Sequence, residues 1–244
     1  MKRLHNYSQH FLKNPRFVHE LIGHTSIKPT DVVYDIGAGS GVISSALARR
    51  CKKVVAIEIE PQTAEILRKN MAAFDNVEVK VADFLALKLP ETPYKIFANI
   101  PFHLTTPIVR KITEDTNPPV AAYLIVQKQF ANKLLPAHNG FSSQLGMILG
   151  VSFSFRIRKR LKRSDFWPHP NVDTVLLEIK RRDQPLVNSN DLISYREFIH
   201  KSFTNPAAFA GLPLAAIGKN TGVKPSSLTL DEWVSLFNAS YNYS

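Results

Sequence analysis

The stretch Asp31-Val-Val-Tyr-Asp-Ile-Gly-Ala-Gly-Ser-Gly, residues 31–41, decides the fold. Its apolar first half is typical of a buried strand, and its second half has glycine at every other position. A helical pattern follows over residues 42–50. Glycines between a strand and a helix let the backbone approach a ligand closely, although they can also serve only to turn the chain. The spacing G-x-G-x-G after an acidic residue differs from the G-x-G-x-x-G of dinucleotide sites.

Strand and helix patterns alternate on both sides of this stretch. A helix is expected over residues 14–25, and another begins at Thr105 or Thr106 with Pro107 at its first position. The other expected elements before residue 140 are strands at 53–59, 77–81, 94–100 and 120–126 and a helix at 61–73. Such alternation predicts an α/β protein with a doubly wound, mostly parallel, Rossmann-like sheet.

The pattern changes after residue 140. Residues 151–158 and 172–180 read as two strands around a proline-rich loop, which would add an antiparallel edge and bring the sheet to seven strands. A polar linker follows, and then helical patterns at 192–203 and 230–237. We therefore expect a large domain over residues 1–181 and a small helical domain over residues 182–244.

The chain of 244 residues is strongly basic, with a net charge of +11 and a pI near 9.8. Six cations fall within residues 156–163, and on a strand Arg156, Arg158, Arg160 and Lys162 would share one face. A protein with this charge usually binds a polyanion, which predicts a nucleic acid partner. The alternatives are a solvated strand edge, or an anionic membrane surface for which no amphipathic anchor helix is present.

Several classes of protein are excluded. The longest apolar run, residues 120–126, is far below the ~20 residues that span a bilayer, and no apolar segment follows the basic N-terminus as in a signal peptide. A single cysteine, Cys51, rules out an internal disulfide and a multi-cysteine metal site. We expect a cytoplasmic protein without a membrane segment or a metal.

Polar residues follow the second and third strands, at the sheet edge where ligands of open α/β sheets bind. Glu58 ends the second strand and can accept hydrogen bonds from both hydroxyls of a ribose; Glu60 competes for this role. Asp83, with Phe84 beside it, follows the third strand and can accept a hydrogen bond from the amino group of an adenine. Together with Gly37 and Gly39, these residues predict a site for a ligand that contains adenosine.

The sequence Asn99-Ile-Pro-Phe after the fourth strand indicates chemistry on an amine. The exocyclic amine of adenine is a poor nucleophile, because its lone pair is delocalised into the ring. The side-chain oxygen of Asn99 and a backbone carbonyl could draw that nitrogen toward a tetrahedral geometry. Pro101 stiffens the loop, and Phe102 offers a flat face on which an extruded base can stack.

In this order, these motifs resemble the rRNA adenine dimethylase family. The resemblance covers roughly residues 6–180. It extends to three further segments, which are Ser8-Gln-His-Phe-Leu, Val126-Gln-Lys-Gln-Phe-Ala-Asn-Lys-Leu and Phe166-Trp-Pro-His-Pro-Asn-Val-Asp. Asn-Ile-Pro-Phe is similar to the Erm branch, which acts on 23S rRNA and confers macrolide–lincosamide–streptogramin B resistance. Asn-Leu-Pro-Tyr would indicate the 16S rRNA dimethylases.

The resemblance implies a monomeric methyltransferase that puts one or two methyl groups on N6 of an adenine in 23S rRNA. S-adenosylmethionine would be its cofactor, and Asn99, Pro101 and Phe102 its catalytic residues. Arg158, Arg160 and Lys162 would hold RNA together with the small C-terminal helical domain. Phe166 is either a second stacking face or a core residue. The implied cofactor contacts are His10 (where relatives usually have asparagine), Leu12, Gly37, Gly39, Glu58, Asp83, Phe84 and Asn99.

Three alternatives stay open at this point. The first is a 16S rRNA dimethylase in ribosome assembly, and the second is a non-catalytic RNA-binding protein that has kept the fold. The third is a DNA adenine methyltransferase, although that class usually has Asp-Pro-Pro-Tyr or Asn-Pro-Pro-Tyr in place of Asn-Ile-Pro-Phe.

Overall fold

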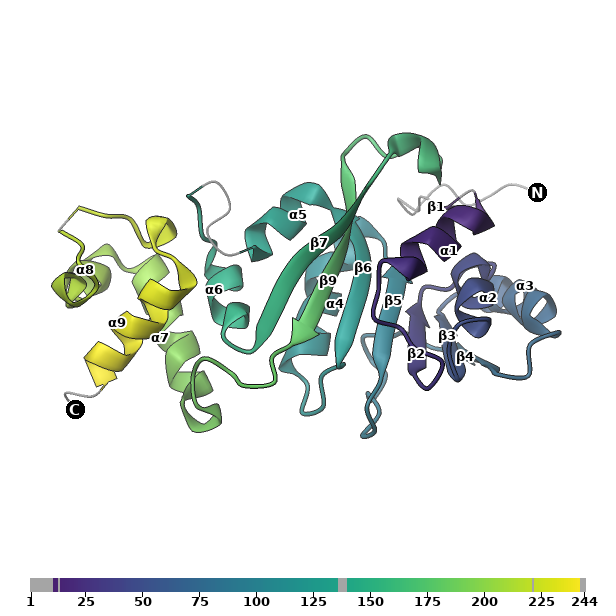
Figure 1. Ribbon diagram of the computed structural model, residues 1–244, viewed down its shortest axis with the longest axis horizontal. Coiled ribbons are helices and arrows are strands. Elements are labelled where there is room, and N and C mark those ends of the chain that lie inside the picture. The colour runs from purple at the N-terminus through teal and green to yellow at the C-terminus, as the bar shows by residue number, and fades with distance from the viewer. Residues whose placement is uncertain (1–10, 13, 136–139, 221, 242–244) are drawn as a thin grey trace. The chain divides into compact units, whose positions relative to one another are not determined.

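The computed structural model describes residues 11–12, 14–135, 140–220 and 222–241 and contains a seven-stranded sheet (Figure 1). The strand order is β4-β3-β2-β5-β6-β9-β7. The strands are β2 (Val32–Ile36), β3 (Lys53–Glu58), β4 (Val77–Val81), β5 (Lys95–Asn99), β6 (Ala121–Gln127), β7 (Phe153–Leu161) and β9 (Thr174–Arg181). Neighbours from β4 to β6 run parallel, and β9 is antiparallel to β6. The predicted mostly parallel, seven-stranded sheet is therefore confirmed.

Helices cover both faces of this sheet. Every residue of β6 from Ala121 to Val126 is buried. Tyr123 and Ile125 belong to a core cluster with α1 (Pro15–Gly23) and α2 (Val42–Ala48). Leu124 and Val126 point to the other face, since side chains alternate along a strand. Figure 1 shows α4 (Thr105–Glu114) behind these strands, while α3 (Pro61–Met71) packs on β3 and β4.

The predicted start of α4 is wrong in detail. The short 3₁₀ turn η1 (Phe102–Leu104) leads directly into the helix, so Leu104 precedes it with a helical backbone and Pro107 is its third residue. No side chain caps this end. Proline is still tolerated there, because the first turn of a helix has no intrahelical acceptor for its backbone N–H groups.

The chain forms two compact units. The first comprises residues 1–128 and 156–180, and the second comprises residues 129–155 and 181–244. The sequence placed a single boundary after residue 181, whereas residues 129–155 belong with the C-terminal helices. The physical reason is packing, because Met147 and Val151 lie in the apolar core of the second unit.

The second unit is helical around a cluster of aromatic side chains. Trp233 is fully buried at its centre, with the rings of Phe198, Phe203 and Phe209 between 5.6 and 5.9 Å away. Its helices are α5 (Lys128–Leu134), α6 (Gln144–Gly150), α7 (Leu192–Thr204), α8 (Pro206–Ala210) and α9 (Leu230–Tyr241). The first residue of α5, Lys128, still belongs to the first unit. The 3₁₀ turns are η3 (Ser189–Asp191), η4 (Leu214–Ile217) and η5 (Pro225–Ser227). Within the described parts of the chain, every helix is too short or too polar to cross a membrane.

Candidate active site

The glycine loop after β2 lies at the carboxyl edge of the sheet. Gly37, Gly39 and Gly41 all have positive φ, at 69°, 57° and 94°, a conformation that other residues rarely adopt. A side chain at Gly37 would meet no atom of the described residues within 4 Å, whereas one at Gly41 would come within 2.7 Å of Leu67 in α3. The first glycine therefore faces open space where a ligand can approach, and the last allows close helix packing.

The carboxylate of Glu58 ties this loop to the end of β3. Its Oε2 accepts a hydrogen bond from the Gly39 amide at 2.9 Å, and its Oε1 accepts one from the Glu60 amide at 3.0 Å. Glu58 is only 5% exposed, and each oxygen retains a second lone pair for a further donor. Glu60 is exposed and its side chain makes no capping bond to α3. This geometry favours Glu58 over Glu60 as the ligand acceptor.

Asp35 is a buried acid at the base of the glycine loop. Its Oδ2 accepts a 2.6 Å hydrogen bond from the Ser44 hydroxyl, while its Oδ1 is buried without a partner among the described residues. Burial raises the pKa of Asp35 to about 7, the charge of Glu58 adds to the rise, and the Ser44 hydrogen bond opposes it. An unpaired buried acceptor is costly, so this oxygen fits a ligand that brings a donor. From the sequence, Asp35 was only the acidic residue that precedes the glycine spacing, and it had no predicted role in the site.

The segment after β4 lies next to Glu58. The Ala82 amide donates to the Glu58 carbonyl at 3.1 Å, which places Asp83 beside the end of β3. Asp83 is exposed, and its Oδ1 accepts a hydrogen bond from the Leu85 amide at 2.9 Å, which fixes a turn. Phe84 is 5% exposed, and the ammonium of Lys111 lies 5.9 Å from the centre of its ring.

Asn99 is the last residue of β5 and lies opposite Ile125 of β6. Asn99, Pro101 and Phe102 are all half-buried, and Phe102 begins η1. Because β5 is the neighbour of β2, Asn99 lies at the same sheet edge as the glycine loop. The structure thus brings together four features that are separated in sequence, namely the glycine loop, Glu58, Asp83 and Asn99.

Two other expected ligand contacts have a different outcome. His10 lies outside the described residues. Leu12 is 7% exposed and belongs to the core cluster below α1. It pairs with Phe166 across the two-stranded sheet of β1 (Phe11–Leu12) and β8 (Phe166–Trp167). Phe166 has no exposed surface and lies in the same cluster, so the core interpretation holds for this ring and the stacking interpretation does not.

The basic strand β7 is only partly available to a ligand. Arg160 and Lys162 are exposed, as expected for RNA contacts. Arg158, in contrast, donates from Nε to the His24 carbonyl at 2.7 Å, and its Nη1 lies 3.7 Å from Glu178. The prediction that Arg158 faces RNA is therefore corrected, because its guanidinium fastens the end of α1 to the sheet.

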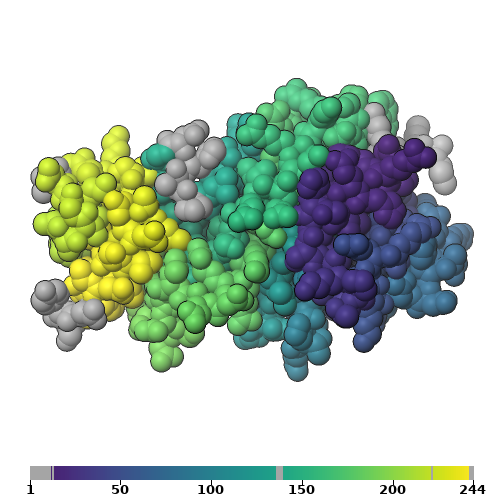
Figure 2. Space-filling view, viewed as in Figure 1, coloured from purple at the N-terminus to yellow at the C-terminus, as the bar shows by residue number. Residues whose placement is uncertain are grey.

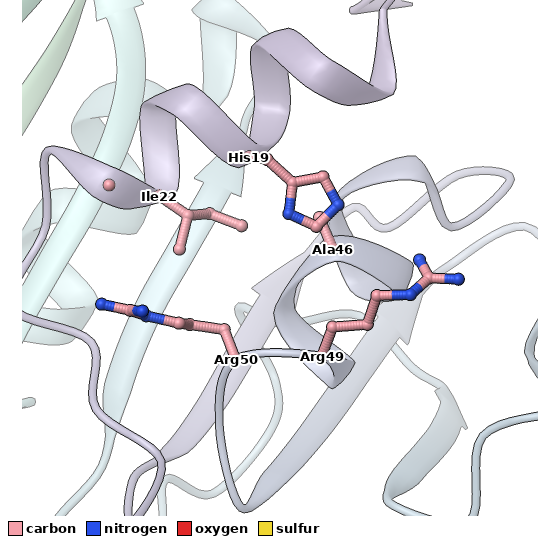
Figure 3. Close-up of a pocket in the computed structure, with 6 residues that line it drawn as sticks. His19, Ile22, Ala46, Arg49 and Arg50 are labelled. Atoms are coloured by element: carbon pink, nitrogen blue, oxygen red, sulfur yellow. The ribbon is translucent and has the colours of Figure 1, made fainter.

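A pocket of about 260 Å³ lies between α1 and α2, away from this edge (Figure 3). His19, Arg49 and Arg50 are among its lining residues. The guanidinium of Arg49 lies 5.0 Å from the ring centre of Phe74, and Arg50 Nε donates to the Ile27 carbonyl at 3.3 Å. Both cations thus have structural partners. They follow the C-terminal end of α2 and so lie away from the glycine loop, toward the opposite edge of the sheet.

Comparison with known proteins agrees with this geometry. The model of the family described as ribosomal RNA adenine dimethylase matches residues 2–208. An rRNA adenine N-6-methyltransferase from Limosilactobacillus reuteri is 29% identical over 95% of this chain and 94% of its own length. A ribosomal RNA small subunit methyltransferase A from Streptococcus agalactiae is 30% identical over 82% of this chain and 74% of its own length. The crystal structure of the 23S rRNA methyltransferase ErmE superposes with a TM-score of 0.84, at 26% identity, over 93% of this chain and 98% of that one.

The fold, the site and these relatives lead to one conclusion. The protein is an rRNA adenine methyltransferase that uses S-adenosylmethionine. The residues at the sheet edge fit this cofactor. Glu58 offers carboxylate lone pairs, and within the part of the chain that the structure describes, the space beside Gly37 is open and one buried oxygen of Asp35 has no donor. The chain belongs to the ribosomal RNA adenine dimethylase family.

Proposed function

We propose that the enzyme methylates N6 of an adenine in 23S rRNA, once or twice, and thereby confers resistance to macrolides, lincosamides and streptogramin B. The observation that supports this choice most directly is Asn99-Ile-Pro-Phe at the end of β5, in place of the Asn-Leu-Pro-Tyr of the 16S enzymes. Such an enzyme would work on ribosomal RNA in the cytoplasm, as a monomer.

The extent of the match with each relative supports the same choice. Identity does not separate the two groups, at 29% and 30%. The chain nevertheless spans 94% of the relative from Limosilactobacillus reuteri and 98% of ErmE, but only 74% of the small subunit enzyme. The similarity thus extends over almost the whole length of the first two proteins and over about three quarters of the third.

For the cofactor, we assign its ribose to Glu58, its amino acid part to the glycine loop from Gly37 to Gly39, and its adenine to Asp83 and Phe84. The family pattern also assigns His10 and Leu12 to this cofactor, and Leu12 has its place in the core cluster of α1. When bound, S-adenosylmethionine supplies a methyl group made electrophilic by a positively charged sulfur.

Asn99 would position the target amine. Its side-chain oxygen and a backbone carbonyl of the Asn-Ile-Pro turn accept the two N6 hydrogens, which pulls the nitrogen lone pair out of conjugation. Pro101 holds the turn and Phe102 stacks on the base. No side chain has to act as a base beforehand, because the surplus proton can leave to water after the nitrogen has gained its new bond.

RNA must present this adenine unstacked, which is cheapest in a loop or in a precursor particle. The exposed cations Arg160 and Lys162 are the candidates for phosphate contacts near the site.

Methylation mapping tests the proposal. The protein would be expressed in a susceptible bacterium, and both large rRNAs analysed by primer extension and by mass spectrometry of nuclease fragments. We expect new N6-methyladenine or N6-dimethyladenine in 23S rRNA, together with raised macrolide resistance, and neither with Asn99→Ala. A mark in 16S rRNA without resistance would instead establish the small-subunit reaction.

A further inference from the structure

We propose that Trp167 is a stacking surface for an unpaired base of the rRNA substrate, close in sequence to the methylated adenine. This inference rests on the activity as an rRNA adenine methyltransferase and deepens it by naming a residue that positions the RNA. Trp167 lies on a segment that we call the platform, residues 162–169.

The topology places the platform at the active edge of the sheet. It precedes β9, whose first residue Thr174 pairs with Gln127 at the carboxyl end of β6. The Lys128 amide also donates to the Asp173 carbonyl at 2.9 Å. Neighbouring strands are ~4.8 Å apart, so the start of β9 lies about 10 Å across the sheet from β5 and Asn99. Figure 2 shows the green surface of this region next to the purple surface of α1.

The backbone of β8 turns Trp167 outward. Phe166 is fully buried in the core, and successive side chains on a strand point to opposite faces. Trp167 is accordingly 56% exposed, which is unusual for so large an apolar residue. Phe166 therefore acts as an anchor that fixes the direction of its neighbour.

The platform also holds the indole in place. The ring of His169 meets the ring of Trp167 edge-on, with centres 6.1 Å apart and planes at 85°. His169 Nδ1 lies 2.8 Å from the Arg163 carbonyl, and since a carbonyl only accepts, Nδ1 carries the proton. Asp165 Oδ2 accepts a hydrogen bond from the Lys162 amide at 2.7 Å, which fixes the turn η2 (Arg163–Asp165). A ring held in advance loses little conformational entropy when a base stacks on it.

Charge around the platform favours a nucleic acid. The side chains of Arg160 and Lys162 are exposed, and that of Arg163 is 57% exposed with Asp173 at 3.7 Å. An aromatic ring among cations is the combination with which proteins bind single-stranded RNA, because bases stack on the ring while the cations hold phosphates. A docked protein would not require this density of positive charge.

The test uses an RNA hairpin cut from whichever rRNA carries the mapped methyl mark, so its outcome is independent of the choice between 23S and 16S. Stacking of one base changes affinity by about 5- to 150-fold. We expect a loss of that size in filter binding for Trp167→Ala, near wild-type affinity for Trp167→Phe, and unchanged affinity of both variants for S-adenosylhomocysteine. Phe141→Ala, which removes an aromatic ring of similar exposure (54%) in the second unit, is the matched control.

Hairpins with one abasic nucleotide, scanned along the positions flanking the target, identify the stacked base. The wild type should lose affinity at one position, and Trp167→Ala should lose nothing further there. Wild-type RNA affinity in Trp167→Ala, or equal losses at every abasic position in both proteins, would overturn the proposal. If Trp167→Ala does not fold, the abasic scan with the wild type and Trp167→Phe tests the proposal instead. Without a stacked base, no single abasic position would lower the RNA affinity more than the others.

Discussion

Replacing Glu58 by glutamine should weaken the enzyme in two separate ways. The carboxylate accepts one backbone N–H on each oxygen, from Gly39 and from Glu60, whereas an amide has one oxygen and one NH₂ group. In either orientation the NH₂ group faces a donor, so one hydrogen bond is lost and a buried donor is left unpaired. Such a loss costs ~2–3 kcal/mol. For a chain of this length the melting temperature should then fall by about 5–10 °C.

The second effect concerns the cofactor. A neutral side chain with a single acceptor replaces a charged acceptor for two ribose hydroxyls, and hydrogen bonds to charged groups are worth ~1.5–3 kcal/mol. Affinity for S-adenosylhomocysteine should therefore fall about 10- to 100-fold. Removing the charge at Glu58 also has an effect that opposes the loss of stability. It lowers the pKa of the neighbouring Asp35 and makes the ionisation of Asp35 less costly.

Thermal unfolding and calorimetric titration with S-adenosylhomocysteine measure the two effects. Glu60→Gln is the matched control, since that side chain is exposed and makes no capping bond. It should melt and bind like the wild type. Wild-type affinity in Glu58→Gln together with weak binding in Glu60→Gln would refute the assignment and transfer the ribose contact to Glu60.

The remaining predictions concern five other positions. Asn99→Ala should fold normally but transfer methyl groups much more slowly, because it loses ~2–4 kcal/mol of transition-state stabilisation. Turnover near that of the wild type would exclude the role of Asn99 in positioning the amine. Phe102→Tyr should be active and Phe102→Ala badly impaired in the same assay, and equal damage by both would indicate a packing role for the ring. Because burial raises the pKa of Asp35 from 3.8 to about 7, its contribution to stability is complete below pH 4 and is lost as the pH rises through 7. Urea unfolding should show a decline of about 4 kcal/mol from this group, which Asp35→Asn removes; an unchanged pH profile in that variant would contradict the shift. Arg158→Gln should lower the stability of the fold without changing the salt dependence of RNA binding. Arg160→Gln, on the exposed part of β7, should leave the stability unchanged and make the salt dependence of RNA binding less steep.

The strand-end features could be predicted because their signals are local. Alternating glycines after an apolar strand, and polar residues directly after the next strands, are visible within a few positions of the chain. In a parallel sheet the carboxyl ends of all strands share one edge, so finding the strands was enough to bring Gly37, Glu58, Asp83 and Asn99 together. Their individual roles remain predictions.

Contacts between distant segments could not be predicted in this way. Arg158 bonds to the carbonyl of His24, 134 positions earlier in the chain, and nothing in the basic run distinguishes it from Arg160. Tyr123 extends the same network, since its hydroxyl donates to Glu178 at 2.9 Å. The choice between the two interpretations of Phe166 likewise depended on which distant residues pack on its ring. The sequence of the loop alone does not give this information. Helix α6 was missed because seven residues are too few to show a clear helical period.

The discontinuous second unit has a consequence for synthesis on the ribosome. Helix α6 emerges early, but Trp233, around which its core forms, follows Met147 by about 86 residues. At the ~5–20 residues per second of translation, roughly 4–17 s pass before this core is complete, although α7, which also packs on α6, emerges earlier. During that interval the nascent chain exposes an apolar segment, which lies in sequence between the two stretches of the first unit. We therefore expect this helix to contribute to aggregation during overexpression, and a chain shortened before α9 would leave exposed the part of α6 that packs against α9.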